Sequence, residues 1–134
     1  MKEQSITNVF EQIAVPLATI ASPQRIALLL AIGRGEVCVC HLETIFGWRQ
    51  AYISQHLMAL RKAGILQVRR QGRYIYYRLK NASYLGLLTA SASLGGISAE
   101  TVSDLINTNT YPSFECTPCA PALISASPLK THKV

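Results

Sequence analysis

Apolar spacing and helix-capping residues together predict five helices in this 134-residue chain. Pro16 lies inside the first of them, so that helix should be kinked or divided there. The second should begin at Ser22-Pro23, because a hydroxyl cap followed by proline is a helix-start signal. The predicted helices cover approximately residues 7–20, 23–32, 38–45, 49–62 and 82–94.

A different pattern separates the fourth and fifth predicted helices. Residues 66–70 and 74–80 are rich in β-forming side chains and are joined by a short link that contains Gly72. Two such runs around a glycine-containing link predict a β-hairpin. Gly64 precedes the hairpin and should end the fourth helix, since glycine readily adopts a left-handed cap.

The C-terminal part of the chain carries weaker signals. Gly95 and Gly96 should break the fifth helix, and residues 97–106 are expected to add a turn or two more. The chain beyond them is rich in turn-forming residues. We therefore expect a domain at residues 1–96, followed by a C-terminal helical turn and a cysteine-containing tail at residues 97–134.

The third and fourth helices and the hairpin form a familiar combination. Two short helices joined by a tight turn, followed by a hairpin with a basic tip, are typical of a winged helix-turn-helix, a mainly α fold with a β-hairpin wing. The second helix of such a unit, here residues 49–62, enters the major groove of DNA. Ile53, Leu57 and Leu60 share one side of this helix and should be buried, which leaves the other side for DNA.

The distribution of charge supports DNA binding. The chain has a net charge of +6 and a pI near 9.4. Residues 25–80 hold ten basic side chains against two acidic ones, while the remainder of the chain is net negative. Positive charge concentrated on the predicted DNA-binding unit indicates a polyanionic partner, and a merely solvated basic surface is the alternative.

Nine side chains are candidates for contact with double-stranded DNA. Glutamine can bond bidentately to adenine and serine can donate or accept, whereas arginine suits phosphates or the minor groove. A histidine at the candidate position either contacts a base or only braces the turn. The candidates are Arg49, Gln50, Tyr52, Ser54, Gln55 and His56 on the helix, and Arg69, Arg70 and Arg73 in the wing.

The expected setting is the cytoplasm, with no membrane partner. The longest apolar run, residues 26–32, is far shorter than the roughly 18 residues of a membrane span, and the N-terminus has no apolar signal core. In a reducing compartment, close cysteine pairs are more typical of ligands or redox switches than of structural disulfides. The chain has two such pairs, Cys38/Cys40 and Cys116/Cys119.

Residues 36–79, EVCVCHLETIFGWRQAYISQHLMALRKAGILQVRRQGRYIYYRL, resemble the ArsR/SmtB family of metal-sensing repressors. Residues 22–25 are similar to the opening of that family's second helix, and the resemblance extends over about residues 5–95. It implies a homodimer that binds operator DNA and dissociates from it when an inducer binds. It also implies a dimer interface made by the first helix and the helix after the wing, here residues 5–20 and 82–96.

Cys38-Val39-Cys40 is similar to the thiolate box of the arsenite and cadmium/lead sensors in that family. Side chains two positions apart in a regular helix point about 200° away from each other, so both cannot easily bind one ion. The pair should therefore lie at a frayed or distorted helix start. A helix N-terminus also favours the thiolate, the form that binds soft metals.

Two thiolates are an incomplete set for trivalent arsenic, and some relatives carry a third cysteine where this chain has Glu43. We expect Cys116 and Cys119 to supply the missing ligands, because their spacing is familiar from thiolate metal sites and family members recruit cysteines from outside the third helix. Four thiolates suit Cd²⁺, Pb²⁺ or Zn²⁺, and three suit As(III) or Sb(III).

Other ligand arrangements have less support. His41 follows the box and can act as a nitrogen ligand, although a place on the helix surface is the more common role. Residues 82–96 contain no Asp, Glu or His, so they cannot build the zinc site that some relatives carry after the wing. This argues against a nickel, cobalt or purely zinc sensor of that type.

The sequence therefore predicts a non-enzymatic, dimeric repressor without an organic cofactor, which releases its operator when Cys38, Cys40, Cys116 and Cys119 bind As(III)/Sb(III) or Cd/Pb/Zn. The alternative is a thiol redox or reactive-sulfur switch that works by disulfide formation. A thiol oxidoreductase built on Cys116 and Cys119 lacks the βαβ setting such a motif needs. A constitutive architectural DNA-binding protein is a further possibility, and its affinity would not respond to any inducer.

Overall fold

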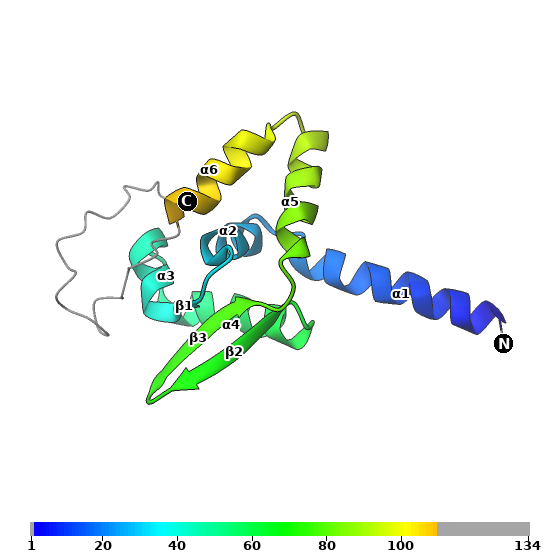
Figure 1. Cartoon of the computed structure of the whole chain (residues 1–134). Helices are drawn as coiled ribbons and strands as arrows, with labels where there is room; N and C mark the ends of the chain where they lie inside the picture. Colours follow the sequence, from blue (N-terminus) through cyan, green and yellow to red (C-terminus); the bar gives the residue numbers. More distant parts are fainter. Residues whose placement is uncertain (1, 110–134) are drawn as a thin grey trace.

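A computed structural model describes residues 2–109 of the chain, with the side chains of residues 5–106. Helices and one small sheet follow each other within this range (Figure 1) and confirm the predicted winged helix-turn-helix, mainly α with a β-hairpin wing. The elements are α1 (Lys2–Ile20), α2 (Pro23–Ile32), β1 (Val37–Cys38), α3 (Val39–Phe46), α4 (Gln50–Lys62), β2 (Leu66–Gln71), β3 (Tyr74–Leu79), α5 (Ser83–Leu94) and α6 (Ala99–Asn109).

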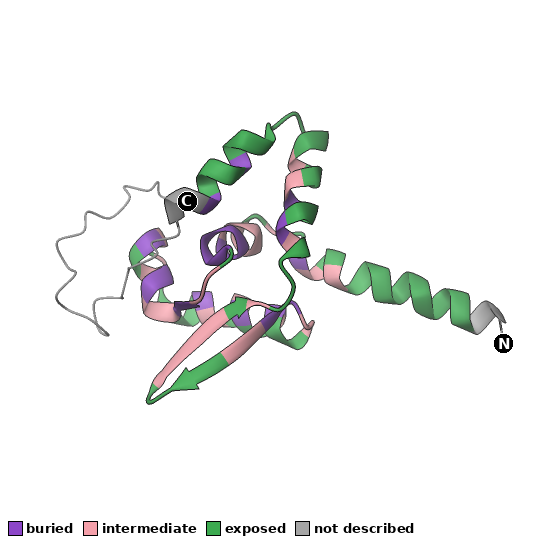
Figure 2. Ribbon diagram, viewed as in Figure 1, coloured by how far each residue is buried: buried purple, intermediate pink, exposed green. Residues whose placement is uncertain are grey.

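Helix α1 projects away from the rest of the described chain (Figure 1). The helix was predicted to be kinked or divided at Pro16, and it continues through this residue as one helix, so a division there is wrong. Proline removes one backbone donor, and the remaining hydrogen bonds hold the helix together on both sides of it. The described side chains of α1 are exposed along most of its length, and Ile20 at its end enters the core (Figure 2).

A bend of 88° separates α1 from α2. Ser22 lies at this bend and caps α2, as predicted: its Oγ accepts a hydrogen bond from the backbone N–H of Arg25 at 3.4 Å, and Pro23 occupies the first turn. Among the described residues, no single helix is long and apolar enough to cross a membrane. Only Ser5–Ile20 and Pro23–Ile32, taken together across the bend, pass by length and composition.

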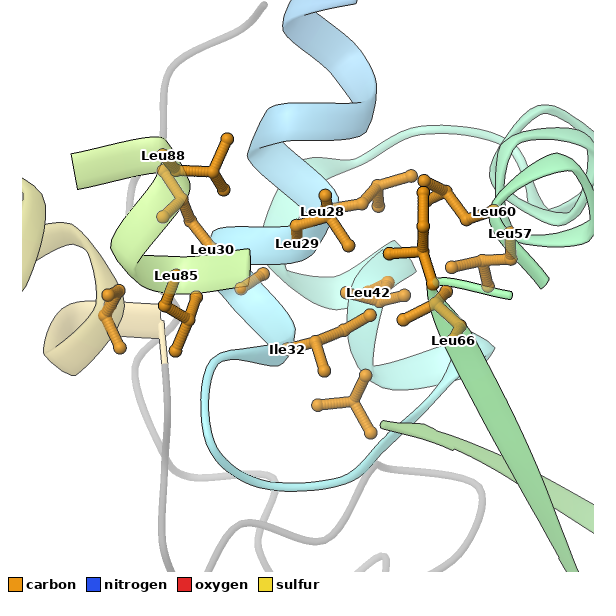
Figure 3. Packing of buried hydrophobic residues seen from close by; sticks show 14 of the residues in the cluster. Leu28, Leu29, Leu30, Ile32, Leu42, Leu57, Leu60, Leu66, Leu85 and Leu88 are labelled. Carbon is orange, nitrogen blue, oxygen red and sulfur yellow. The ribbon is translucent and has the colours of Figure 1, made fainter. Parts of the chain in front are cut away.

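Helix α2 is the centre of the hydrophobic core. Its side chains Leu28, Leu29 and Ile32 are fully buried. The predicted helix-turn-helix and wing pack on one side of α2 and helix α5 packs on the other, so a single helix supports both. Figure 3 shows these contributions as Leu42 of α3, Leu57 and Leu60 of α4 and Leu66 of β2 on one side, and Leu85 and Leu88 of α5 on the other.

The sheet has the strand order β1-β3-β2, with both pairs antiparallel. Strands β2 and β3 form the predicted hairpin, with Leu66 paired to Leu79 at its base and Gln71 to Tyr74 at its tip. The short strand β1 was not predicted, since two residues carry no periodic signal. It exists because β3 offers it a partner, and Cys38 pairs there with Tyr76.

The C-terminal helices form a second layer over α2. Helix α5 ends before Gly95 and Gly96, as predicted. Helix α6 is longer than the expected turn or two, and it packs against α2 and α5. Its residues Val102 and Ile106 are buried and join the same core cluster, which explains why the helix persists.

Candidate nucleic-acid interface and thiol site

A tight turn joins α3 to α4. Helix α3 ends at Gly47, whose φ of 71° is the left-handed conformation that glycine adopts without strain. Extended backbone at Arg49 then starts α4. Because Ile53 and Leu57 are fully buried against the core, the opposite side of α4 is turned outward. The pair α3–α4 thus has the arrangement of a helix-turn-helix, with α4 as its second helix.

The six candidate residues on α4 differ in exposure. Three are exposed polar side chains at the beginning and middle of the helix, and Tyr52 is 39% exposed. The remaining two are half-buried, so only part of each is available to a partner. The exposed polar residues are Arg49, Gln50 and Gln55, and the half-buried ones are Ser54 and His56.

A row of aromatic side chains, each in contact with the next, extends from the turn onto α4. Phe46 stacks on Trp48 with ring centroids 4.4 Å apart, and Trp48 meets Tyr52 edge-on at 5.6 Å. Tyr52 in turn meets His56 edge-on at 4.7 Å. Such contacts restrict the side-chain rotamers of the candidate DNA-facing residues. Phe46 and Trp48 were not predicted as part of this site, although the four-residue spacing of Trp48, Tyr52 and His56 is a visible signal.

His56 is held from the other side by Arg25 of α2. The Arg25 Nε donates to His56 Nδ1 at 3.0 Å, while its Nη1 donates to the Thr19 carbonyl at 2.9 Å. Partial burial and the charge of Arg25 lower the pKa of His56, because both disfavour the imidazolium. This geometry corresponds to the bracing role that the sequence left open, since it ties α4 to the bend between α1 and α2.

The three wing arginines are in different situations. Arg70 and Arg73 are exposed. Arg69 instead forms a two-pronged ion pair with Glu36, at 2.7–3.1 Å, and its guanidinium lies 4.8 Å from the centroid of the Tyr76 ring. The Arg69 guanidinium lowers the pKa of Glu36, and the carboxylate raises that of Arg69. Arg69 is therefore engaged within the protein.

Cys38 and Cys40 lie at the start of α3, as their spacing required. Cys38 is the N-cap, with extended backbone at φ −97° and ψ 167°, and Cys40 follows in the first helical turn. This change of backbone conformation between them brings the two Sγ atoms to 2.7 Å from each other. In their reduced form, both sulfurs can therefore bind one ligand, which side chains two positions apart inside a regular helix cannot easily do.

The side chain of Cys38 is buried, and Cys40 is disulfide-bonded. The predicted ligands Cys116 and Cys119 lie outside the described residues. Within residues 2–109, no group of three Cys, His, Asp or Glu side chains is close enough to hold a metal ion. The described chain thus contains two sulfurs close to each other, and in their reduced, thiolate form such sulfurs are soft donors suited to thiophilic ions.

His41 does not occupy the helix surface, so that expectation is wrong. Its side chain is only 5% exposed, and burial lowers its pKa to about 4. The first turn of α3 points inward at this position, because Leu42 and Ile45 of the same helix pack into the core. His41 is consequently a neutral core residue at physiological pH.

A pocket of about 290 Å³ opens beside the two sulfurs. Three separate parts of the fold meet in it: the thiol box, the first residue of α4 and the tip of the wing. The sensor predicted from the sequence thus borders directly on the elements predicted to contact DNA. The pocket is lined by Cys38, Val39, Cys40, Glu43, Gln50, Arg73, Tyr74 and Ile75.

Comparison with known proteins shows which protein family this chain resembles in sequence. The family model described as "Bacterial regulatory protein, arsR family" matches residues 22–68, from the cap of α2 to the middle of β2. A biofilm growth-associated repressor from Agrobacterium fabrum is 38% identical over 79 residues, which are 59% of this chain and 68% of that protein. The arsenic resistance transcriptional regulator ArsR1 from Pseudomonas putida is 48% identical over 61 residues, 45% of this chain and 48% of that one.

A solved structure agrees with these relatives. The transcriptional repressor BigR from Xylella fastidiosa superimposes with a TM-score of 0.59 and 32% sequence identity, over 70% of this chain and 96% of that chain. This chain therefore spans about two thirds of the Agrobacterium repressor and about half of the Pseudomonas regulator. The matches centre on the region that contains the thiol box and α4.

Proposed function

Because this chain belongs to the ArsR family of bacterial regulatory proteins, which are DNA-binding transcriptional regulators and not enzymes, we propose that it is a repressor that senses a thiophilic metalloid or metal through Cys38 and Cys40. The observation that carries this proposal is the convergence of the two sulfurs, 2.7 Å apart, on a pocket shared with α4 and the wing. Ligand binding there lowers operator affinity.

The proposed DNA contacts follow the helix-turn-helix geometry. Helix α4 enters the major groove, where Gln50 and Gln55 are exposed and able to bond to base edges, and Arg49 meets a phosphate at the start of the helix. Arg70 and Arg73 extend the contacts along the wing. Tyr52, Ser54, His56 and Arg69 remain candidates, with His56 and Arg69 limited by the contacts they make within the protein.

The class of ligand follows from the donor atoms. Thiolates select soft ions, and two of them leave a coordination shell open. We propose that Cys116 and Cys119 complete it, with three thiolates for As(III) or Sb(III), or four for Cd²⁺, Pb²⁺ or Zn²⁺. Relatives named as arsenic resistance regulators, such as that of Pseudomonas putida, support the metalloid.

We further propose that the repressor is a cytoplasmic homodimer. Helix α1 exposes a large apolar surface that the rest of the described chain does not cover, with Phe10 62% exposed and Ile13 57% exposed. A second copy of the chain would cover this surface. The resulting dimer would carry two DNA-binding units, which can bind the two half-sites of an operator.

Native mass spectrometry of the reduced, anaerobic protein tests the sensing proposal. Wild type and a Cys116→Ser/Cys119→Ser variant are offered arsenite, Cd²⁺, Pb²⁺ and Zn²⁺ in competition. We expect one ion per subunit in wild type, with weaker or absent uptake in the variant. A Cys38→Ser/Cys40→Ser variant should bind none. Uptake that is independent of Cys38 and Cys40 would refute the proposed site.

A second candidate, a thiol redox switch, is favoured by one observation: Cys40 is disulfide-bonded. In this mechanism a peroxide oxidises two thiols, which lose their two protons and two electrons to form a disulfide, and the peroxide is reduced to water. Cys116 or Cys119 would be the partner. The loss of about two mass units on mild oxidation, together with operator release and no uptake of any metal, would favour this function over metal sensing.

A further inference from the structure

The pocket beside the thiol box has the tip of the wing as its second wall. Arg73, Tyr74 and Ile75 line it together with Cys38 and Cys40. Arg73 is exposed, and its guanidinium lies 5.6 Å from the centroid of the neighbouring Tyr74 ring. Glu43 lines the same pocket with an acidic side chain, so both signs of charge border it. A cation predicted to contact DNA therefore borders the space that the proposed ligand occupies.

The thiol box and the wing are also joined through the backbone. Strand β1, which contains Cys38, is hydrogen-bonded to β3, and Cys38 pairs there with Tyr76. The ion pair between Glu36 and Arg69 fastens the start of β1 to β2. Among the described residues, β1 pairs with Tyr76 and Tyr77, so the middle of the wing is fixed to the thiol box and Arg73 lies beyond this pairing.

We propose that Arg73 is the positioning residue that transmits ligand binding to DNA: it contacts an operator phosphate in the ligand-free protein and is displaced from that phosphate when the pocket is filled. This inference rests on the proposed function and specifies how ligand binding at the thiol site lowers operator affinity. An ion bound by Cys38 and Cys40 would lie in the pocket that these cysteines line together with Arg73, Tyr74 and Gln50.

Neighbouring arginines provide matched comparisons. Arg70 lies on the same hairpin, is exposed and is predicted to contact phosphate, but it does not line the pocket. Its contact with DNA should persist when ligand binds. Arg73 and Arg70 are therefore predicted to make the same kind of contact with DNA, but only Arg73 lines the pocket.

The test measures operator affinity of the reduced full-length protein over a range of salt concentrations, with and without arsenite or Cd²⁺. Each phosphate contact contributes about 0.9 to the slope of log K against log salt. In wild type the ligand should reduce the slope by about 0.9 per subunit and the affinity roughly 5- to 150-fold. Arg70→Gln should start from a smaller slope and show the same further reduction.

Without ligand, Arg73→Gln should show the same smaller slope of log K against log salt as Arg70→Gln. Adding ligand to Arg73→Gln should then change the slope and the operator affinity by only a small part of the wild-type response. Arg73→Lys keeps the charge and should restore both. Equal ligand responses in Arg73→Gln and wild type would overturn this inference and leave the proposed function standing. So would a failure of Arg73→Lys to restore them. If wild type and Arg70→Gln respond to neither arsenite nor Cd²⁺, both the inference and the metal-sensing function are refuted.

Discussion

At the scale of single residues, polar side chains that were predicted to contact DNA prove to be bonded to residues distant in the sequence. His56 and Arg69 are both polar side chains on DNA-facing elements, yet each is held by a residue more than thirty positions away, Arg25 and Glu36 respectively. Such partners are set by packing, so their identity leaves no trace in the sequence around His56 or Arg69. The consequence is that some DNA-facing candidates also support the protein itself.

The lowered pKa of His56 predicts an acid-sensitive contribution to stability. The folded protein binds fewer protons at this site than the unfolded chain between the folded pKa and the ordinary value of 6.5. The contribution is therefore fully present above about pH 6.5 and is lost as the pH falls through that value toward the folded pKa. His56→Gln keeps an acceptor for Arg25 but does not titrate. Urea unfolding from pH 7.5 to 5 should show a smaller loss of stability in His56→Gln than in wild type, and identical profiles would contradict the assignment.

The ion pair between Glu36 and Arg69 predicts a change in DNA binding rather than in folding. Glu36→Gln removes the carboxylate that holds Arg69 at 2.7 Å. The released guanidinium should then be able to make an additional phosphate contact, which would steepen the salt dependence of operator binding by about 0.9 per subunit. Fluorescence anisotropy titrations at several salt concentrations measure this slope. Arg69→Gln is the control, and it should leave the slope of wild type nearly unchanged.

At the scale of elements, periodicity was a sound guide where an element is long enough to show it. The helices and the hairpin are where their apolar spacing placed them, and α4 buries the predicted Ile53, Leu57 and Leu60. Strand β1 and the full length of α6 escaped prediction. Two residues cannot display a period, and α6 is stabilised by burying Val102 and Ile106 against a helix far away in sequence.

The buried side of α4 predicts a large difference between two neighbouring substitutions. Leu57 is fully buried and Met58 is 56% exposed. Leu57→Ala leaves a cavity and should cost about 2–5 kcal/mol of unfolding free energy. Met58→Ala on the same helix should remain within about 0.5 kcal/mol of wild type. Chemical denaturation followed by the single tryptophan, Trp48, measures both, and a Leu57→Ala variant as stable as Met58→Ala would refute this account of how α4 is anchored.

At the scale of the whole molecule, α1 is the feature that a single chain does not explain. Its described apolar residues are largely exposed (Figure 2), although helices in proteins gain most of their stability by packing an apolar face. The proposed homodimer accounts for it, because a second chain would bury this surface.

Substitutions on α1 should therefore separate association from folding. Phe10→Glu/Ile13→Glu places charge on the exposed apolar surface and should shift the protein to monomers in sedimentation experiments. Operator affinity should fall as well, because a monomer binds only one half-site of the operator. Leu105→Glu on α6, a residue that is also partly exposed, is the control and should leave the dimer intact. A double variant that sediments like wild type would exclude α1 as the interface.

The sequence by itself determined the winged helix-turn-helix, the basic DNA-binding unit and the pairing of cysteines at a helix start. These are local properties: periodicity, capping residues, charge and spacing act over a few neighbouring positions. The proposed ligands Cys116 and Cys119 remain predictions outside the described residues. Tertiary structure alone decided that the sulfurs of Cys38 and Cys40 converge, because strand β1 forms only against β3. It also decided that the wing tip borders the thiol pocket, since this depends on how separate elements pack around α2.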